Sequence, residues 1–326
     1  MIRFLTAMVE QIKAVGLLSS GIDSALAIRL VKEQGIEVVA VNLVLPFADD
    51  REDYAARLAR QLDVPLIRIE AGEDYIELVR HPRHGYGSGM NPCIDCRIYM
   101  LKRAWEVAEG MGARFLVTGD VLGERPMTQH RAALELEERE SGLQGLVLRP
   151  LSARLLPETV PEGEGWVDRE KLLAIKGRRR TPQLELARRY GITGFRTPGG
   201  GCLLTNKEFS ARLKSLFHMQ EMVSARDIQL LKIGRHFFHQ GAHIIVGRNE
   251  RENRLLLELE RPEDYVLEAK GYAGPVTLLR GSKVPEAVEF AASLTARYSD
   301  APSGEVTVEC RSDGRTQTIT VSKAVS

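Results

Sequence analysis

Short apolar runs alternate with amphipathic stretches through the first part of the chain. The apolar runs predict strands at residues 14–18, 38–44, 65–69 and 115–117. The stretches between them have helical periodicity and predict helices at residues 24–34, 52–62 and 94–110. Strands and helices that alternate in this way are typical of an α/β domain with a mostly parallel sheet. Ligands of such sheets bind beyond the carboxyl ends of the strands.

The pattern changes in the second part of the chain. Residues 163–190 are charged and predicted to be helical, and a turn region rich in Pro and Gly follows them. Beyond about Ala225, short alternating strands surround one helix near residues 287–298. We therefore predict two domains, an α/β domain with a parallel sheet at residues 1–205 and a smaller α+β domain at residues 206–326.

The composition is that of a globular protein, and it bears on where the protein is located and on what it can bind. The chain has 326 residues, of which 44% are hydrophobic and 27% charged, enough to bury two cores. The first ten residues lack a secretory apolar region, and no later run is long enough to span a bilayer, so we expect a cytoplasmic protein with no membrane partner. The formal net charge is +1, so nucleic-acid binding would depend on local basic patches such as residues 176–180.

The segment SSGIDS at residues 19–24 follows the first predicted strand and leads into the first predicted helix. Backbone N–H groups and the helix dipole converge on an anion at such a junction. Gly21 permits a tight turn, the serine hydroxyls can bind phosphate oxygens, and Asp23 is suited to hold Mg²⁺ or to orient the loop. The competing interpretation is a serine-rich helix cap without a ligand.

Three of the four cysteines lie in a pattern that indicates metal or sulfur chemistry. Cys93 and Cys96 begin a predicted helix, where the dipole favours thiolates and the spacing lets both bind one metal centre. Cys202 follows three glycines, which let the backbone fold tightly around a cluster. Three thiolates on a four-iron cluster leave one iron open, and an open iron can hold sulfide. Cys310 lies in a strand-like stretch and is expected in a core.

Two other interpretations of these cysteines stay open. Cys93 and Cys96 fit a redox pair in which one cysteine carries a persulfide and the other resolves it. They also fit a structural zinc site that is completed by a histidine such as His81 or His84. The three interpretations differ in the metal that the protein would carry.

The segment at residues 19–24 resembles the phosphate loop of the PP-loop ATP pyrophosphatases, whose signature is Ser-Gly-Gly-x-Asp-Ser. Ser20 stands here in place of the first glycine of that signature. The resemblance implies cleavage of ATP between the α- and β-phosphates, which gives an adenylated substrate and pyrophosphate. It implies that ATP is bound by Leu17, Ser19, Ser20, Gly21, Asp23, Ser24, Asn42 and Gly119.

Further motifs resemble, in order, those of the tRNA thiouridine synthases over roughly residues 14–204. They are residues 91–96, with the sequence NPCIDC, then Thr118-Gly119-Asp120 and Arg149-Pro150-Leu151. The likeness is to the two-thiouridylases of the MnmA/TrmU type, with elements shared by the four-thiouridine synthases and the cluster-dependent thiolases (the ThiI/TtuA type). Those enzymes have Thr-Gly-His where Asp120 stands here, so the base that is modified cannot be transferred from them.

This second resemblance implies ATP-dependent thiolation of a tRNA uridine. The implied catalytic residues are Asp23, Cys93 and Cys202, and the implied ligands of a [4Fe-4S] cluster are Cys93, Cys96 and Cys202. ATP and Mg²⁺ are the other implied cofactors. The implied partners are tRNA and a sulfur donor, either sulfide or a cysteine-desulfurase relay, and a homodimer is compatible with this function.

The second domain carries a shorter resemblance. Gly234-Arg235-His236 and residues 246–253 resemble the small RNA-associated domain of the NFACT proteins of ribosome quality control (NFACT-R). We therefore expect phosphate and base contacts to RNA from Arg235, His236, Arg248 and Asn249. We also expect RNA contacts from Arg178 and Arg179 in the basic run. The alternative is that these residues belong to turns and surfaces of a small sheet.

Two rival functions fit part of the pattern. One is a PP-loop enzyme of sulfur transfer or amidation that acts on a small molecule and has no affinity for tRNA. The other is a non-catalytic RNA-binding translation factor with a degenerate loop, for which Ser20 is the best support. Release of pyrophosphate from ATP would separate both enzymes from the RNA-binding factor.

Overall fold

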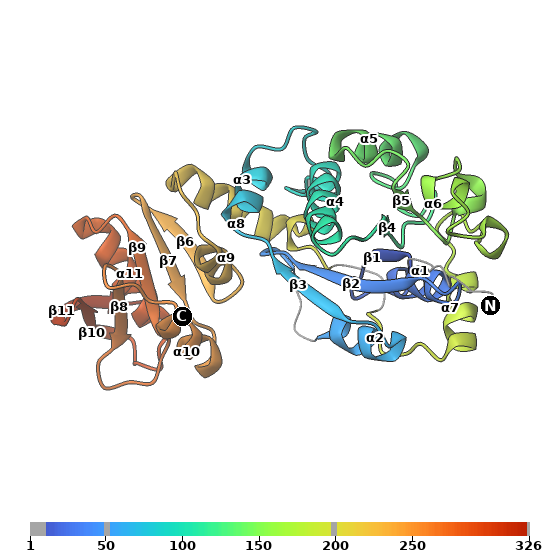
Figure 1. Ribbon diagram of the computed structural model, residues 1–326. Coiled ribbons are helices and arrows are strands. Elements are labelled where there is room, and N and C mark those ends of the chain that lie inside the picture. The colour runs from blue at the N-terminus through green and yellow to red at the C-terminus, as the bar shows by residue number, and fades with distance from the viewer. Residues whose placement is uncertain (1–10, 49–52, 197–200, 325–326) are drawn as a thin grey trace, which may run out of the picture. The chain divides into compact units, whose positions relative to one another are not determined.

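The structure is a computed structural model that describes residues 11–48, 53–196 and 201–324 (Figure 1). The chain divides into two compact units, Met1–Thr205 and Asn206–Ser326. The first ten residues and two of the three glycines before Cys202 lie outside the described residues. No helix in the described part of the chain is long and apolar enough to cross a bilayer.

The first unit is built on a parallel sheet of five strands in the order β3-β2-β1-β4-β5. Its strands are β1 (Lys13–Leu17), β2 (Glu37–Val44), β3 (Leu66–Glu70), β4 (Phe115–Val117) and β5 (Val147–Leu148). The chain adds β2 and β3 on one side of β1 and then places β4 on its other side. The carboxyl ends of β1 and β4 therefore flank the point where the strand order reverses, which is where open α/β sheets bind ligands.

Helices cover both faces of this sheet (Figure 1). They are α1 (Ile22–Lys32), α2 (Tyr54–Leu62), α3 (Glu73–Arg80), α4 (Cys93–Gly110), α5 (Arg131–Ser141), α6 (Val160–Gly163) and α7 (Thr181–Tyr190), with 3₁₀ turns at Ala153–Leu155, Arg169–Lys171 and Leu203–Thr205. Alternate residues of β1 serve the two cores: Ala14 packs with α1, α2 and α7, and Val15 packs with α4. A β-carbon at Gly16 would lie 2.5 Å from Ile28 of α1, so glycine sets the close approach of helix and strand.

The second unit contains an antiparallel sheet of six strands in the order β11-β10-β8-β9-β7-β6. Its strands are β6 (Arg235–His239), β7 (Ala242–Val246), β8 (Tyr265–Ala269), β9 (Thr277–Gly281), β10 (Gly304–Ser312) and β11 (Arg315–Lys323). Its helices are α8 (Lys207–Met219), α9 (Ala225–Leu231), α10 (Glu250–Glu258) and α11 (Pro285–Tyr298). Helix α11 packs on one face, where Cys310 is buried as expected, and residues of α9 and α10 pack on the other.

The fold class expected from the sequence is confirmed, but one predicted helical region is wrong. Residues 163–190 contain a helix only at α7, preceded by the end of α6 and a 3₁₀ turn. Gly165 and Gly177 have φ values of 69° and 84°, in the left-handed region that interrupts a helix. The helices α3, α5, α8, α9 and α10 were not predicted from the sequence.

Candidate functional site

The loop between β1 and α1 is held together by its own serine hydroxyls. The Ser24 hydroxyl accepts a hydrogen bond from the Ser19 backbone N–H at 3.1 Å and donates one to the Gly21 carbonyl at 3.0 Å. The Ser19 hydroxyl accepts from the Gly21 N–H at 3.1 Å. The chain bends at residues 20 and 21, but Gly21 has ordinary extended backbone angles, φ −92° and ψ 155°, so this conformation does not require glycine. The loop is preformed and leads directly into the positive end of the α1 dipole.

Asn42 of β2 supports this loop from behind. Its side-chain amide donates a hydrogen bond to the Leu18 carbonyl at 2.8 Å, and the Leu18 N–H donates to Val41 at 2.8 Å. Asn42 therefore fixes the backbone that follows β1. Its expected position near an adenosine stays a prediction.

Asp23 lies in the first turn of α1 and is largely buried. One of its carboxylate oxygens is 3.2 Å from the Arg180 guanidinium, which also binds Glu124. The other oxygen is buried and finds no hydrogen-bond partner among the described residues. Burial and the nearby Glu124 carboxylate raise the pKa of Asp23 to about 6, against the opposing effect of Arg180. An oxygen in this state is suited to bind a cation.

Gly119 brings the end of β4 against the phosphate loop. A β-carbon at this position would lie 2.4 Å from the Ser24 backbone nitrogen and 2.5 Å from the Asp23 carbonyl carbon. Any larger residue would displace either β4 or the first turn of α1. The sequence Thr118-Gly119-Asp120 thus forms a wall of the site beside the loop.

Asp120 is the centre of a buried ionic network that the sequence did not predict. It pairs with Arg97 of α4, accepts from Thr118 at 2.8 Å and from Gln129 at 3.0 Å, and lies 3.8 Å from Arg149. Burial alone would raise its pKa, but the two arginines dominate and lower the pKa to about 2. Because Arg97 directly follows Cys96, this network ties the start of α4 to the end of β4.

Glu137 of α5 lies beside the same network, but its carboxyl group differs from that of Asp120 in protonation. Its side chain is fully buried, and neither carboxylate oxygen finds a hydrogen-bond partner among the described residues. Burial raises its pKa to about 8, although Arg97, 3.8 Å away, opposes this. At neutral pH the carboxyl group is therefore mostly protonated.

The cysteines at the start of α4 each receive a hydrogen bond. The Asn91 side-chain amide donates to the Cys93 sulfur at 3.1 Å, and the Tyr75 hydroxyl donates to the Cys96 sulfur at 3.1 Å. Both donors are buried, so their positions are fixed by packing.

The backbone around Cys202 is paired with two segments that are distant in the sequence, one just beyond β2 and one just before α4. It forms an isolated β-bridge with Ala48, just beyond β2, and the next residue donates to the Phe47 carbonyl at 2.9 Å. The Met90 N–H donates to the Leu204 carbonyl at 2.9 Å, which links the segment to the loop before α4. The thiols of Cys93, Cys96 and Cys202 are close enough to influence one another electrostatically.

Desolvation opposes the thiolate form of Cys96 and Cys202. Burial raises the pKa of Cys96 to about 12, and the nearby thiols of Cys202 and Cys93 add to this effect. Desolvation also raises the pKa of Cys202, although the residue as a whole is exposed. The expectation of a dipole-stabilised thiolate is therefore wrong for Cys96, since desolvation outweighs the dipole.

Cys93, Cys96 and Cys202 are the kind of donor that binds an iron–sulfur cluster, and they come from two segments of the chain. As the side chains stand, no group of three or more His, Cys, Asp or Glu residues in the described part of the chain is arranged to hold a metal ion. The zinc interpretation loses support at His84, whose ring nitrogens face Asp95 at 3.0 Å and Glu140 at 3.4 Å.

The basic run at residues 176–180 lies along the loop that follows Asp120. Lys176 bridges to Leu122, and the Gly177 N–H donates to the Leu122 carbonyl at 2.7 Å. Arg180 turns inward to Asp23 and Glu124. Arg178 and Arg179 are exposed, so they are accessible to a polyanion near the phosphate loop.

In the second unit the two arginines that are predicted to contact RNA each have a partner within the protein. Arg235 lies over the Tyr298 ring, 4.5 Å from its centroid. Arg248 forms a bidentate pair with Glu252 across the start of α10, which Asn249 caps. This use of Arg248 favours the turn-and-surface interpretation of that motif.

The paired histidines of the second unit are not cations. His236 and His243 share a hydrogen bond of 3.0 Å, and burial, aided by Arg212, lowers the pKa of His236 to about 3. A neutral imidazole contributes no charge to phosphate binding. The expectation of a phosphate contact at His236 therefore loses support.

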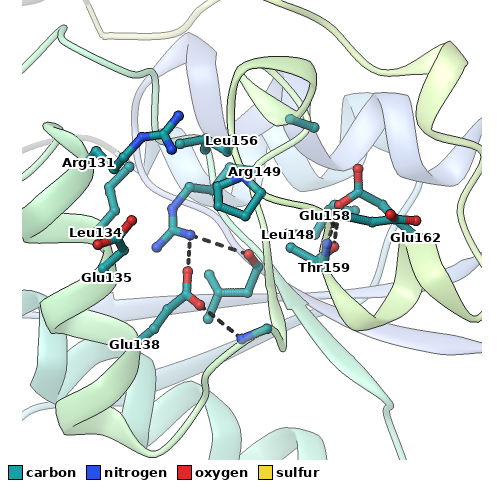
Figure 2. Close-up of a pocket in the computed structure, with 14 residues that line it drawn as sticks. Arg131, Leu134, Glu135, Glu138, Leu148, Arg149, Leu156, Glu158, Thr159 and Glu162 are labelled. Atoms are coloured by element: carbon teal, nitrogen blue, oxygen red, sulfur yellow. Dashed lines mark hydrogen bonds and ion pairs between the residues drawn. The ribbon is translucent and has the colours of Figure 1, made fainter.

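A pocket of about 140 Å³ lies apart from the phosphate loop and the cysteines, between α5, β5 and α6 (Figure 2). Figure 2 shows the Arg149 guanidinium directed at Glu138, with Thr159 and Glu162 on the opposite wall. Its volume is well below the roughly 300 Å³ of the smallest ligand pockets. None of the residues predicted to bind ATP or a cluster lines it.

Comparisons with known proteins match both parts of the chain. Residues 9–153 match the sequence model of the thiamine biosynthesis protein family (ThiI), and residues 234–326 match that of the NFACT protein RNA binding domain. The chain is 31% identical to a tRNA-specific 2-thiouridylase MnmA of Clostridium botulinum over 31% of this chain and 32% of that protein. It is 22% identical to the tRNA-specific 2-thiouridylase MnmA of Listeria monocytogenes over 95% of this chain and 87% of that protein.

Other matches cover part of each protein. The chain is 27% identical to a probable tRNA sulfurtransferase of Thermococcus kodakarensis, over 34% of this chain and 30% of that protein. A solved complex of a 4-thiouridine synthetase with RNA and bound ATP is 20% identical, with a TM-score of 0.37, over 68% of this chain and 52% of that one. The match spans about a third of the length of the curated clostridial relatives. The expected resemblance to the thiouridine synthases and to the NFACT RNA-binding domain is confirmed.

Proposed function

We propose that this chain uses ATP to activate a tRNA uridine and then replaces its carbonyl oxygen with sulfur. One observation carries the proposal: the unit with a serine-rich loop at the switch point of its parallel sheet also contains Cys93, Cys96 and Cys202, whose thiols lie within electrostatic range of one another. The likeness of residues 9–153 to the ThiI family supports the same chemistry. The likeness of residues 234–326 to an RNA-binding domain supports an RNA substrate.

In the first step, the uridine carbonyl oxygen attacks the α-phosphorus of ATP, and the bond from this phosphorus to the pyrophosphate oxygen breaks. The loop N–H groups and the hydroxyls of Ser19 and Ser24 hold the phosphates. The carboxylate of Asp23, which has one oxygen without a hydrogen-bond partner among the described residues, would hold Mg²⁺, and the ion would offset charge on the phosphates. The products are an adenylated base and pyrophosphate.

In the second step, a sulfur nucleophile attacks the activated carbon, and AMP leaves with the former carbonyl oxygen. Cys93, Cys96 and Cys202 would hold a [4Fe-4S] cluster, which supplies a site for sulfide when it is bound. Tyr75 and Asn91 fix the sulfur atoms of Cys96 and Cys93 through their hydrogen bonds. Sulfide, or a relay from a cysteine desulfurase, delivers the sulfur.

Under this proposal, arginines outside the site of the reaction bind the phosphates of the substrate RNA. The exposed Arg178 and Arg179 lie next to the loop that follows β4, where they can contact phosphates. Arg235 is the better candidate of the two arginines in the second unit, since the Arg248 guanidinium is already engaged by Glu252. The uridine must leave the base stack to reach the phosphate loop.

The two steps can be separated with ATP labelled at the α-phosphate and unmodified tRNA. We expect tRNA-dependent formation of AMP and pyrophosphate by the wild-type protein, and its loss by at least 10²-fold in Asp23→Asn. Cys93→Ser and Cys202→Ser should still release pyrophosphate, because adenylation does not need the thiols. Pyrophosphate release without tRNA would favour a small-molecule enzyme, and tRNA binding without release would favour an RNA-binding factor.

A further inference from the structure

The loop from Val121 to His130, between β4 and α5, has contacts both near the loop at residues 19–24 and near the cysteines at the start of α4. It is closed on itself by a hydrogen bond of 2.6 Å from the Gly123 N–H to the Gln129 carbonyl. The Leu122 N–H donates to the buried Ser152 hydroxyl at 2.9 Å. The path of the loop is therefore fixed by the first unit itself.

One part of the loop contacts the phosphate loop. The Glu124 carboxylate accepts from Arg180, and the same guanidinium lies 3.2 Å from Asp23. Gln183, which is fully buried, donates to Glu124 at 3.3 Å. Residue 124 is thus anchored beside the first turn of α1.

A neighbouring part of the loop contacts the cysteine segment. The Met127 sulfur is 4.0 Å from the Asn91 amide nitrogen, and the same amide donates to the Cys93 sulfur. A β-carbon at Gly87 would lie 2.6 Å from the Met127 sulfur, so the packing here is close. The two contacts, at Glu124 and Met127, therefore lie within one short stretch of the loop.

Arg125 lies between these two contacts. The residue is exposed, and its guanidinium makes no hydrogen bond or ion pair with the described residues. Its backbone N–H donates to the Gln129 side chain at 2.9 Å, and Gln129 in turn donates to Asp120. The backbone of Arg125 is therefore held, while its charged end is open to a ligand.

We propose that Arg125 binds the α-phosphate of the bound nucleotide, on the side that faces the thiols. Guanidinium groups bind two phosphate oxygens at once, which suits an arginine for the phosphate that becomes part of the leaving AMP. Charge accumulates on this phosphate when the uridine attacks it and again when sulfur displaces AMP. Arg125 thereby serves both steps. This inference rests on the proposed function, and it adds a residue that binds the reacting phosphate.

The test is to titrate the purified full chain with adenosine, AMP and ATP, for the wild type and for Arg125→Met and Arg125→Lys. We expect Arg125→Met to weaken binding of AMP and ATP by about 10- to 100-fold, with adenosine affinity unchanged. Arg125→Lys should recover part of the loss, because it restores the charge but not the two-point contact. Unchanged adenosine affinity also shows that the variant is folded.

Arg139→Met is the matched control, since Arg139 is an exposed arginine in the last turn of α5 and should leave all three affinities unchanged. Equal affinities for AMP in the wild type and Arg125→Met would overturn the inference. So would a wild-type protein that binds AMP no better than adenosine. A wild type that binds AMP through Arg125 but never forms pyrophosphate with tRNA would contradict the proposed function and leave the phosphate contact standing.

Discussion

Single carboxyl groups in the first unit differ sharply in their ionisation, and their neighbours explain why. Asp120 faces two arginines and two neutral donors, which keep it charged, with a pKa of about 2. Glu137 is buried without a hydrogen-bond partner among the described residues, which raises its pKa to about 8. The same network therefore holds one carboxylate and one carboxylic acid at neutral pH.

Glu137 makes the stability of the first unit depend on pH. Its pKa is raised in the folded state, so its contribution is fully present below the pKa of about 4.5 in the unfolded chain and is lost as pH rises through about 8. A pKa that differs by one between the folded and unfolded chain corresponds to about 1.4 kcal/mol, so the free energy of unfolding should fall by a few kcal/mol across this range. Glu137→Gln should remove most of this slope.

Urea unfolding between pH 5 and pH 9 measures the effect, with the wild type and Glu137→Gln compared at each pH. Glu135→Gln is a suitable control, because Glu135 is exposed on the same helix. Parallel pH profiles for the wild type and Glu137→Gln would show that this carboxyl does not titrate as described.

Helix and strand positions in the first unit could be predicted from the sequence because most strands are buried runs and the helices between them are amphipathic. Strand β4, predicted at residues 115–117, is observed as Phe115–Val117. The region before α7 could not be predicted, because the left-handed glycines Gly165 and Gly177 break the helical pattern that its charged residues suggest.

Only part of the site could be predicted from the sequence, because some of its contacts join residues that are distant in the chain. The phosphate loop is local, so its motif could be recognised. The network around Asp120 depends on Arg97 and Arg149. The position of Arg125 beside the site became evident only from the contacts that Glu124 and Met127 make in the structure. Arg97, Asp120 and Arg149 lie far apart in the chain, so no short motif predicts their network.

Helix α4 carries Cys93 and Cys96 in its first turn, and the Ala48–Cys202 bridge fixes the backbone of the third cysteine. If these cysteines hold a cluster, the protein should bind iron. After anaerobic reconstitution with iron and sulfide, we expect about four iron atoms per chain, and near-complete loss in Cys93→Ala, Cys96→Ala and Cys202→Ala. Cys310→Ala is the matched control, because this cysteine is buried in the core of the second unit. Iron and acid-labile sulfide analysis gives the result. An iron-free wild type would contradict the cluster and favour a persulfide relay.

The chain joins a unit that matches the thiamine biosynthesis protein family (ThiI) to a unit that matches the NFACT protein RNA binding domain. The first contains the loop at residues 19–24 and the three cysteines Cys93, Cys96 and Cys202, and the second contains a six-stranded sheet. Under our proposal, the first unit performs both chemical steps and the second contributes to RNA affinity.

The most direct test is mass spectrometry of the nucleosides of unmodified tRNA after anaerobic incubation with the reconstituted protein, ATP and sulfide. We predict a thiouridine that requires ATP and disappears with Cys202→Ser and with Asp23→Asn, while Cys310→Ala still forms it. Unmodified uridine in every sample, from a protein that binds ATP and tRNA, would contradict the central claim.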